Sequence, residues 1–230
     1  MLLETKNLGF RYGGEEAGNR CPWIFRGVNL AFEIESGCKV ALLGDSGSGK
    51  TTLGKLLARY ENPSEGEVLL PGAVFGRGCY PVQLILQHPE TAVNPRFKMR
   101  DILNEGWPSG KTRRVQPPEA QPPERLRFRK LCGRLGIERA WLDRYPLELS
   151  GGELQRFCIA RALGPATRFI IADEITAMFD LITQAQIWEA LLDEIRERGI
   201  GLIAITHDRD LARRVCTETI LMEDIAANTG

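Results

Sequence analysis

The sequence has no excess of either charge sign, since 30 Lys and Arg residues balance 30 Asp and Glu residues over its 230 positions. A chain without net charge has no overall field to draw it onto nucleic acid or an anionic membrane, so we expect no nucleic-acid partner. The sequence also lacks any apolar run of the about 18 residues that a membrane-spanning helix needs. Its first residues, Met1 to Lys6, carry charge where a secretory signal peptide is apolar. We therefore expect a protein that is neither secreted nor membrane-spanning by itself.

Paired cysteines are missing as well, because the six cysteines form no C-x-x-C motif. Their spacing fits neither the disulfide framework of a small secreted domain nor a zinc site, so we expect reduced thiols. Apolar residues make up 43% of the chain and charged residues 26%, which excludes disordered, collagen-like and coiled-coil classes. A chain of this length forms one large domain, or a domain with a sizeable insertion.

Short apolar runs and helical spacings alternate along most of the chain. Three runs predict buried strands: Lys39–Leu43, Phe169–Ala172 and Leu202–Thr206. Two stretches predict helices with one apolar face: Leu53, Leu56, Leu57 and Tyr60 within 52–60, and Ile187, Trp188, Leu191, Leu192 and Ile195 ahead of Gly199. This order predicts an α/β fold with a mostly parallel sheet, whose ligands bind at the carboxyl ends of the strands.

The two remaining parts of the chain differ from this pattern. Residues 2–34 mix short apolar runs with glycines, and 28–34 alternates with period two, which predicts a small antiparallel edge sheet. Residues 89–156 predict an inserted helical subdomain with a proline-rich loop at 108–123, leaving 1–88 and 157–230 as the core of a single domain. Nine Lys or Arg residues against three Glu between Lys111 and Arg139 favour a solvated helix face over a surface for an acidic partner.

A glycine-rich motif follows the first predicted strand and precedes a predicted helix. It matches G-x-x-x-x-G-K-[ST] and continues into the helix as Gly44, Asp45, Ser46, Gly47, Ser48, Gly49, Lys50, Thr51 and Thr52. Glycines let backbone N–H groups converge on phosphate oxygens, and the N-terminus of the helix adds positive potential. Lys50 neutralises phosphate charge and Thr51 is a ligand for Mg²⁺, so the motif predicts ATP binding with magnesium.

Two carboxylates end the predicted strand at 169–172. Asp173 is expected to hold magnesium, and Glu174 to polarise the water that attacks a phosphate. Two acids after a strand can also simply cap a helix, so this pair alone does not establish the chemistry.

A second glycine pair lies far from the first motif, in Leu149-Ser150-Gly151-Gly152-Glu153-Leu154-Gln155-Arg156. Ser150 can cap a helix, and Gly151 and Gly152 leave its first N–H groups open, which makes a second anion site. This stretch resembles the signature of the ATP-binding cassette (ABC) proteins. Gln87 after an apolar run, Asp180 six residues after Glu174, and His207 after a strand match the same family's order and spacing.

The resemblance implies an ABC nucleotide-binding domain, with a P-loop NTPase core, an antiparallel β subdomain and a helical subdomain. In that family Gln87 would sense magnesium and the attacking water, His207 would hold the γ-phosphate, and Tyr12, or Phe10 in its place, would stack on adenine. Thr51, Gln87 and Asp173 would bind the metal. ATP would lie between this chain's P-loop and Ser150, Gly151, Gly152 and Glu153 of a second ABC ATPase subunit, with Asp180 at the contact, so a hetero- or homodimer is implied.

The chain resembles importer ATPases most, because it carries no fused membrane helices, second cassette or long coiled coil. Leu86-Gln87-His88-Pro89 and Tyr145-Pro146-Leu147-Glu148 are similar to the peptide and nickel uptake branch. That branch implies two integral membrane permease subunits, an extracytoplasmic substrate-binding protein, and a peripheral position at the cytoplasmic face of the inner membrane.

The sequence departs from the family at two positions, where Ile175 replaces a usual proline and Phe179 a common leucine, and the tail extension often seen in this branch is missing. Two other functions stay open: a soluble ATPase that regulates or remodels a cytosolic partner without a permease, and a nucleotide-binding module with little hydrolysis. The second would predict loss of Glu174, Gln87 or His207, and all three are present.

Overall fold

The structure is a computed structural model that describes residues 1–13, 21–34, 37–72, 80–107 and 122–227. The chain forms two compact units, one of Met1–Val74 with Gly201–Gly230 and one of Phe75–Ile200. Within the described ranges, no helix combines the length and the apolar character required to cross a membrane.

An antiparallel sheet built around one long strand opens the first unit. Strand β1 (Leu2–Phe10) pairs with β2 (Phe25–Val28), β3 (Ala31–Glu33) and β5 (Glu65–Leu69). The predicted antiparallel sheet is confirmed, and the alternation at 28–34 is shared between two of its strands. The break between the two strands lies opposite Thr5 of β1. The Thr5 hydroxyl donates to the Val28 carbonyl and accepts the Leu30 N–H, so the Leu30 N–H bonds to a side chain instead of to the backbone of β1.

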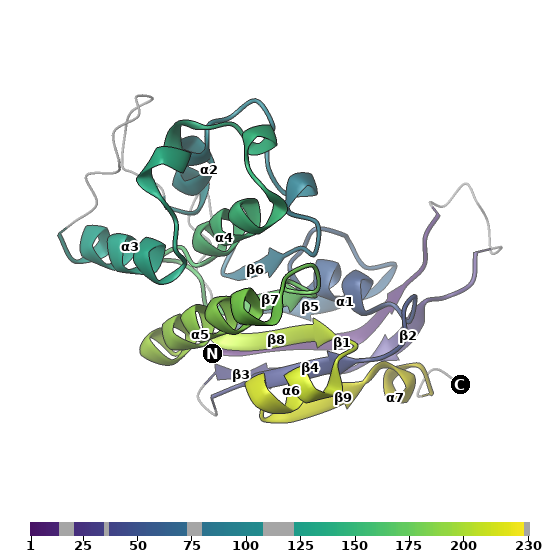
Figure 1. The fold of residues 1–230 in the computed structure, drawn as a ribbon. Coiled ribbons are helices and arrows are strands. Elements are labelled where there is room, and N and C mark those ends of the chain that lie inside the picture. Colours follow the sequence, from purple (N-terminus) through teal and green to yellow (C-terminus); the bar gives the residue numbers. More distant parts are fainter. Residues whose placement is uncertain (14–20, 35–36, 73–79, 108–121, 228–230) are drawn as a thin grey trace. The chain divides into compact units, whose positions relative to one another are not determined.

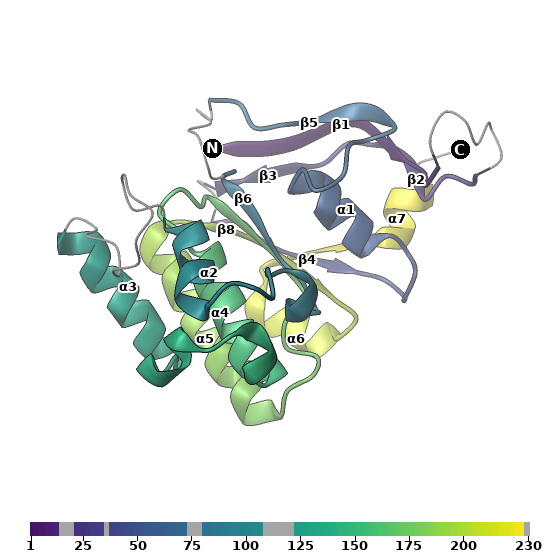
Figure 2. The ribbon, with the colours of Figure 1, turned by 90° about the horizontal axis from the view of Figure 1, so that it is seen from above.

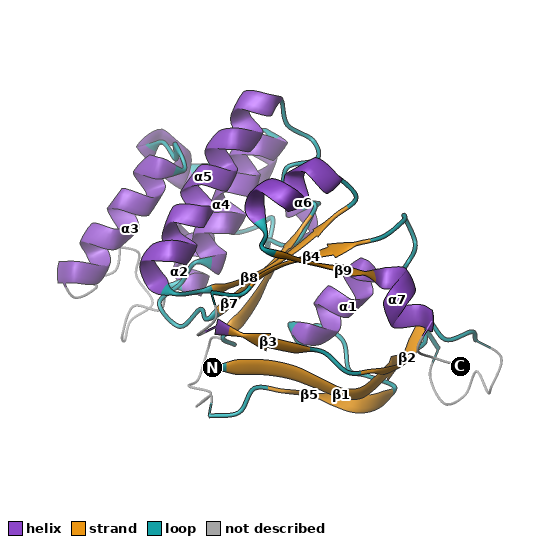
Figure 3. Ribbon diagram, turned by 90° about the horizontal axis from the view of Figure 1, so that it is seen from below, coloured by secondary structure: helices purple, strands orange, loops and turns teal. Residues whose placement is uncertain are grey.

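Parallel strands form the second half of this unit. Strand β4 (Lys39–Leu43) pairs with β8 (Gly201–Thr206) on one side and with β9 (Glu218–Leu221) on the other. Figure 3 shows helix α1 (Lys50–Leu57) between these strands and the antiparallel sheet, and helix α6 (Arg209–Val215) on their other face. The last helix, α7 (Met222–Ala227), follows β9 directly. The predicted strands at 39–43 and 202–206 and the α/β class are confirmed.

Helix α1 is shorter than its apolar spacing predicts. The side chains of Leu53, Leu56 and Leu57 are buried, but Tyr60 lies beyond the helix and is 59% exposed. Arg59 takes a left-handed φ of 57°, and the Tyr60 N–H bonds back to the Lys55 carbonyl at 2.8 Å. This closing turn directs the chain away from the helix axis, so Tyr60 cannot continue the buried face.

The second unit contains two parallel strands and most of the helices, which Figures 1 and 2 show from two sides. Strand β6 (Val82–Ile85) pairs with β7 (Phe169–Asp173), and every residue of β7 is buried. Its helices are α2 (Met99–Gly106), α3 (Pro122–Arg134), α4 (Gly151–Ala162) and α5 (Leu181–Arg198). Short 3₁₀ helices lie at η3 (Pro89–Thr91), η4 (Arg139–Asp143) and η5 (Pro146–Glu148).

Helix α5 confirms the predicted apolar face at Ile187, Trp188, Leu191 and Ile195, which are buried, whereas Leu192 is only half-buried. The helix ends at Gly199, as predicted. The proline-rich loop predicted at 108–123 lies almost entirely outside the described residues.

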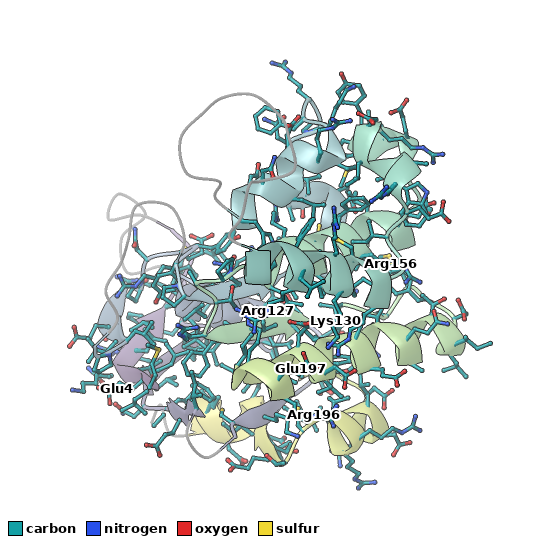
Figure 4. All side chains as sticks on the ribbon, turned by 90° about the vertical axis from the view of Figure 1, so that its left-hand side faces the viewer. Glu4, Arg127, Lys130, Arg156, Arg196 and Glu197 are labelled. Carbon is teal, nitrogen blue, oxygen red and sulfur yellow. The ribbon has the colours of Figure 1, made fainter. Side chains whose placement is uncertain are left out.

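Ion pairs connect α3 to α5. Lys130 Nζ lies 3.2 Å from Glu197, which Figure 4 shows at the facing surfaces of the two helices, and Arg134 Nη1 lies 3.1 Å from the buried Glu194. The hydrogen bonds from Arg134 and Lys130 lower the pKa of Glu197 to about 2. Two of the nine basic residues noted in the sequence thus have acidic partners within the same unit.

A half-buried arginine closes the turn between α4 and β7. The guanidinium of Arg198 donates to the carbonyls of Leu163 at 2.6 Å and Gly164 at 2.7 Å, and it also reaches those of Pro165 and Thr167. Burial lowers its pKa to about 10, which leaves it charged at neutral pH. The carbonyls of the turn that follows α4 are therefore satisfied from the end of α5.

Candidate functional site

The glycine-rich loop lies at the carboxyl end of β4 and leads directly into α1. Lys50 is the first residue of the helix, and its ammonium donates to the carbonyls of Gly44 at 2.6 Å and Asp45 at 2.8 Å. The Lys50 side chain is buried, so its charge is held over the loop rather than in solvent. The structure thus brings the predicted phosphate-binding residues into one turn at a helix N-terminus, where backbone N–H groups favour an anion.

Close packing fixes the shape of this loop. Gly49 has a φ of 94°, and a Cβ built there would lie 2.6 Å from Ile24 Cγ2, which leaves no room for a side chain. The Ser48 Oγ is buried and has no hydrogen-bond partner among the described residues. An unpartnered hydroxyl within a phosphate-binding loop fits an anionic ligand, because a phosphate oxygen would satisfy it.

Tyr12 and His207 belong to the same unit as the loop. The Tyr12 ring is 54% exposed, meets Phe10 edge-on at 5.0 Å between centroids, and places its hydroxyl 3.2 Å from Thr52 Oγ1 on α1. An exposed ring held against the helix that follows the loop can stack on a base. His207 follows β8, and because Thr206 pairs in register with Leu43, it lies at the strand edge where the loop begins.

The other catalytic candidates lie together in the second unit. Asp173 is the last residue of β7 and is 4% exposed, and Glu174 follows it with a left-handed φ of 46°. Since Ile85 pairs with Ala172, the chain leaves β6 beside the end of β7. The Gln87 amide then donates to the Glu174 carboxylate at 3.2 Å. This bond holds an acceptor carboxylate beside an amide, an arrangement that can orient a water molecule.

Ser150 caps α4 as the sequence predicts. Its hydroxyl accepts the Glu153 N–H at 3.3 Å, and the Glu153 carboxylate accepts the Ser150 N–H at 2.7 Å. These bonds from Ser150 lower the pKa of Glu153. Gly151 is exposed, while a Cβ at Gly152 would lie 3.2 Å from the Phe179 ring. The start of α4 therefore exposes backbone at Gly151 and packs against the Phe179 ring at Gly152.

Asp180 caps α5 and is not a free side chain. Its carboxylate accepts the N–H groups of Ile182 and Thr183 at 3.0 Å and the Thr183 hydroxyl at 2.6 Å. The Thr183 hydroxyl contributes most to lowering the pKa of Asp180. Around this cap three apolar side chains are exposed: Met178 at 62%, Leu181 at 81% and Ile182 at 73%.

Sequence reasoning missed this apolar turn. Part of the signal was present, since Ile182 falls opposite the helical face defined by Ile187, Leu191 and Ile195. Leu181 lies seven residues before Trp188, so spacing alone places it with the buried face.

The residues predicted to bind magnesium fit that metal by their donor atoms. Thr51, Gln87 and Asp173 offer hydroxyl, amide and carboxylate oxygens, the hard ligands that Mg²⁺ prefers. No group of three or more His, Cys, Asp and Glu side chains placed to hold a metal ion occurs in the described part of the chain.

Comparisons with known proteins agree with these features. The sequence model of a family described as ABC transporter matches residues 28–177. The nickel import ATP-binding protein NikE of Escherichia coli is 33% identical over 233 aligned residues, covering 97% of this chain and 84% of that protein. The oligopeptide transport ATP-binding protein OppF of Streptococcus mutans is 32% identical, covering 93% and 69%.

Solved structures share the fold. The dimeric structure of MJ0796, a bacterial ABC transporter cassette, matches with a TM-score of 0.74 and 25% identity over 95% of this chain and 93% of that one. A putative metal-chelate type ABC transporter in an inward-facing conformation matches with a TM-score of 0.69 and 23% identity, over 96% and 79%.

Proposed function

Because the chain belongs to the ABC transporter family and is an ATPase that serves transport, we propose that it energises uptake of nickel, another chelated metal or peptides through separate permeases. The observation that carries this proposal is the bond between Gln87 and Glu174, which holds the expected water-polarising carboxylate in a chain that also has a complete P-loop. NikE and OppF, which the chain matches over most of its length, support the cargo class.

The proposed mechanism assigns each residue one task. The loop from Gly44 to Gly49, Lys50 and the N-terminus of α1 bind the phosphates of ATP, and Tyr12 stacks on adenine. Thr51, Gln87 and Asp173 would hold Mg²⁺, which neutralises phosphate charge when bound. Glu174 polarises the attacking water and His207 holds the γ-phosphate and orders that water, so both act on the bond that breaks.

A second ATPase subunit completes the proposed site. The start of α4, from Ser150 to Glu153, would take the nucleotide bound by the partner, and Asp180 would lie at the contact. The exposed Met178, Leu181 and Ile182 beside Asp180 support this contact, because such side chains gain free energy when a partner covers them. The dimeric structure of MJ0796 gives a precedent for pairing, and a homodimer and a heterodimer are both consistent with it.

The permeases and the binding protein follow from the importer proposal. Residues 89–156 would form the helical subdomain that meets two integral membrane permease subunits at the cytoplasmic face of the inner membrane, beside a core of 1–88 and 157–230. An extracytoplasmic substrate-binding protein would supply the cargo. The test is to tag the protein in its native cell, solubilise membranes gently and identify what co-purifies. Permeases and a second ATPase would support the proposal, whereas only soluble partners would contradict it and favour a cytosolic regulator.

Hydrolysis is tested separately with Glu174→Gln. The amide still accepts a hydrogen bond from Gln87 but polarises water poorly, so we expect kcat to fall by about 10²- to 10⁴-fold while ATP binding persists. Glu189→Gln, which changes an exposed acid on α5, is the matched control and should keep the original turnover. Unchanged turnover in Glu174→Gln would remove this residue from catalysis.

A further inference from the structure

The residue that follows β9 packs on the first glycine of the glycine-rich loop. Leu43 ends β4 and pairs in register with Leu221, which ends β9. The two chains therefore leave the sheet side by side, one as Gly44 and the other as Met222. A Cβ built on Gly44 would lie 2.9 Å from Met222 Cβ and 3.2 Å from Met222 Cγ. Met222 is 2% exposed, so it meets the Gly44 backbone inside the first unit.

A residue of the loop itself covers the same face of Gly44. A Cβ on Gly44 would also lie 2.8 Å from Ser48 Oγ. The φ of Gly44 lies outside the left-handed range, so lack of space rather than backbone conformation requires glycine here. Ser48 and Met222 thus fill the space into which a side chain would project, and both are in contact with the Gly44 backbone.

This contact bears on Lys50 through the Gly44 carbonyl. That carbonyl accepts a hydrogen bond from the Lys50 ammonium at 2.6 Å, and the Asp45 carbonyl accepts one at 2.8 Å. Two backbone oxygens thus hold the ammonium, and the position of one of them depends on where the Gly44 backbone lies. A cavity beside Gly44 would let this backbone relax toward it and would loosen one of the two anchors.

Helix α7 also connects the elements at the two ends of the loop. The helix begins at Met222 and packs against β2, which Figure 3 shows beside it. Ile24, the residue before β2, lies where a Cβ on Gly49 would meet it at 2.6 Å. The elements that touch the first and the last glycine of the loop therefore pack on each other, which resists independent movement of either.

We propose that Met222 is a positioning residue for ATP binding. Its Cβ and Cγ fix the Gly44 backbone, and the Gly44 carbonyl then fixes the Lys50 ammonium at the place where a phosphate binds. Because Lys50 would contact phosphate both before and during bond cleavage, loss of this positioning should weaken binding and leave the chemical step intact. This inference rests on the proposed function, since it takes Lys50 as the phosphate-binding cation.

A series of substitutions at 222 tests this role by removing the atoms over Gly44 one at a time. Met222→Leu keeps Cβ and Cγ, Met222→Ala keeps only Cβ, and Met222→Gly keeps neither. Calorimetric titration of each purified chain gives the Kd for MgATP, and steady-state rates give kcat and KM. The Kd should match the wild type in Met222→Leu, and should rise about twofold in Met222→Ala and about tenfold in Met222→Gly, the range expected for one displaced hydrogen bond. The kcat should stay within about twofold of the wild type.

Two control variants separate positioning from a loss of stability. Ile225→Ala truncates a side chain that is 6% exposed on the same helix and that is not among the atoms nearest to Gly44 or Gly49. It should lower the melting temperature about as much as Met222→Ala but leave the Kd unchanged. Glu223→Gly places the same flexible residue at the exposed neighbouring position of α7, so it measures the effect of glycine on the helix alone.

The outcomes separate this role from the proposed function. If the wild-type chain does not bind MgATP, the proposed phosphate site itself fails. If the wild type binds MgATP but Met222→Gly and Glu223→Gly have the same Kd, or Ile225→Ala weakens binding as much as Met222→Ala, Met222 has no positioning role. A fall in kcat without a rise in Kd would overturn it as well. Should Met222→Gly not fold, the proposal still requires a higher Kd in Met222→Ala than in Met222→Leu.

Discussion

Replacing Gly49 by alanine tests how Ile24, the residue just before β2, shapes the glycine-rich loop. Two costs add at this position. The left-handed φ of 94° costs a residue with a Cβ about 1–2 kcal/mol. The new methyl would also meet Ile24 Cγ2 at 2.6 Å, and because that methyl belongs to a stiff β-branched side chain, relief by movement costs roughly 1–3 kcal/mol. We therefore expect Gly49→Ala to lower the free energy of unfolding by about 2–5 kcal/mol.

Gly47→Ala provides the comparison that isolates the steric part. Gly47 has a φ of 83°, but a Cβ there would meet nothing within 4 Å, so only the backbone cost of about 1–2 kcal/mol applies. Both variants and the wild type are unfolded by heat and by urea, with and without MgATP. The melting temperature should fall by roughly 2–4 °C for each kcal/mol lost, and more in Gly49→Ala than in Gly47→Ala.

A double variant completes the test. Ile24→Ala removes the methyl in question, so its effect combined with Gly49→Ala should be smaller than the sum of the two single effects. Equal losses in Gly47→Ala and Gly49→Ala, or strict additivity with Ile24→Ala, would refute the claim that Ile24 presses on the loop.

Three further predictions follow from single side chains. Tyr12→Ala should weaken ATP binding about 5- to 150-fold in a titration, because the base loses its stacking partner. Tyr12→Phe keeps a ring and should bind ATP almost normally. Equal losses of ATP affinity in the two variants would contradict stacking. The pKa of Glu197 is lowered from 4.5 to about 2, so its contribution to stability is complete above pH 4.5 and is lost as the pH falls toward 2. Wild type and Glu197→Gln should therefore differ in acid unfolding above pH 4.5 and converge near pH 2, and a constant difference would be inconsistent with the ion pairs. Ile175→Pro should lower the free energy of unfolding by about 1–3 kcal/mol, because it removes a side chain that is only 2% exposed. It should also change kcat, because proline restricts the backbone of Glu174 just before it. Thermal unfolding checks the first effect and steady-state rates check the second.

The sequence predicts those parts of the fold whose pattern is local. Lys39–Leu43 and Phe169–Asp173 are strands because continuous apolar runs of this length are buried on both faces, and α5 forms as predicted because its apolar residues keep one face until Gly199. The P-loop and the Ser150 cap are equally local, since a few adjacent residues specify each of them.

Other features depend on contacts between distant residues and could not be predicted in this way. The split of 28–34 into two strands depends on the Thr5 hydroxyl, which lies more than twenty residues away. The hydrogen bond from Gln155 to the Leu86 carbonyl joins residues that are 69 positions apart, and no spacing in the sequence reveals that Gln155 faces Leu86. Helix α1 ends early because of a left-handed Arg59, a residue type that does not signal a helix end as glycine does.

The role of Arg198 has a consequence for how natural variation at this position should be interpreted. Lysine would preserve the charge there, but a single ammonium cannot spread over carbonyls that a planar guanidinium reaches with two nitrogens. A Lys at 198 would leave part of the turn before Phe169 unsatisfied and would loosen the entry into the strand that ends in Asp173. Among relatives of this chain, an Arg-to-Lys exchange at 198, which substitution tables score as conservative, should therefore accompany changes in the strand that ends in Asp173. Selection should tolerate it less there than at the exposed Arg196 two residues earlier.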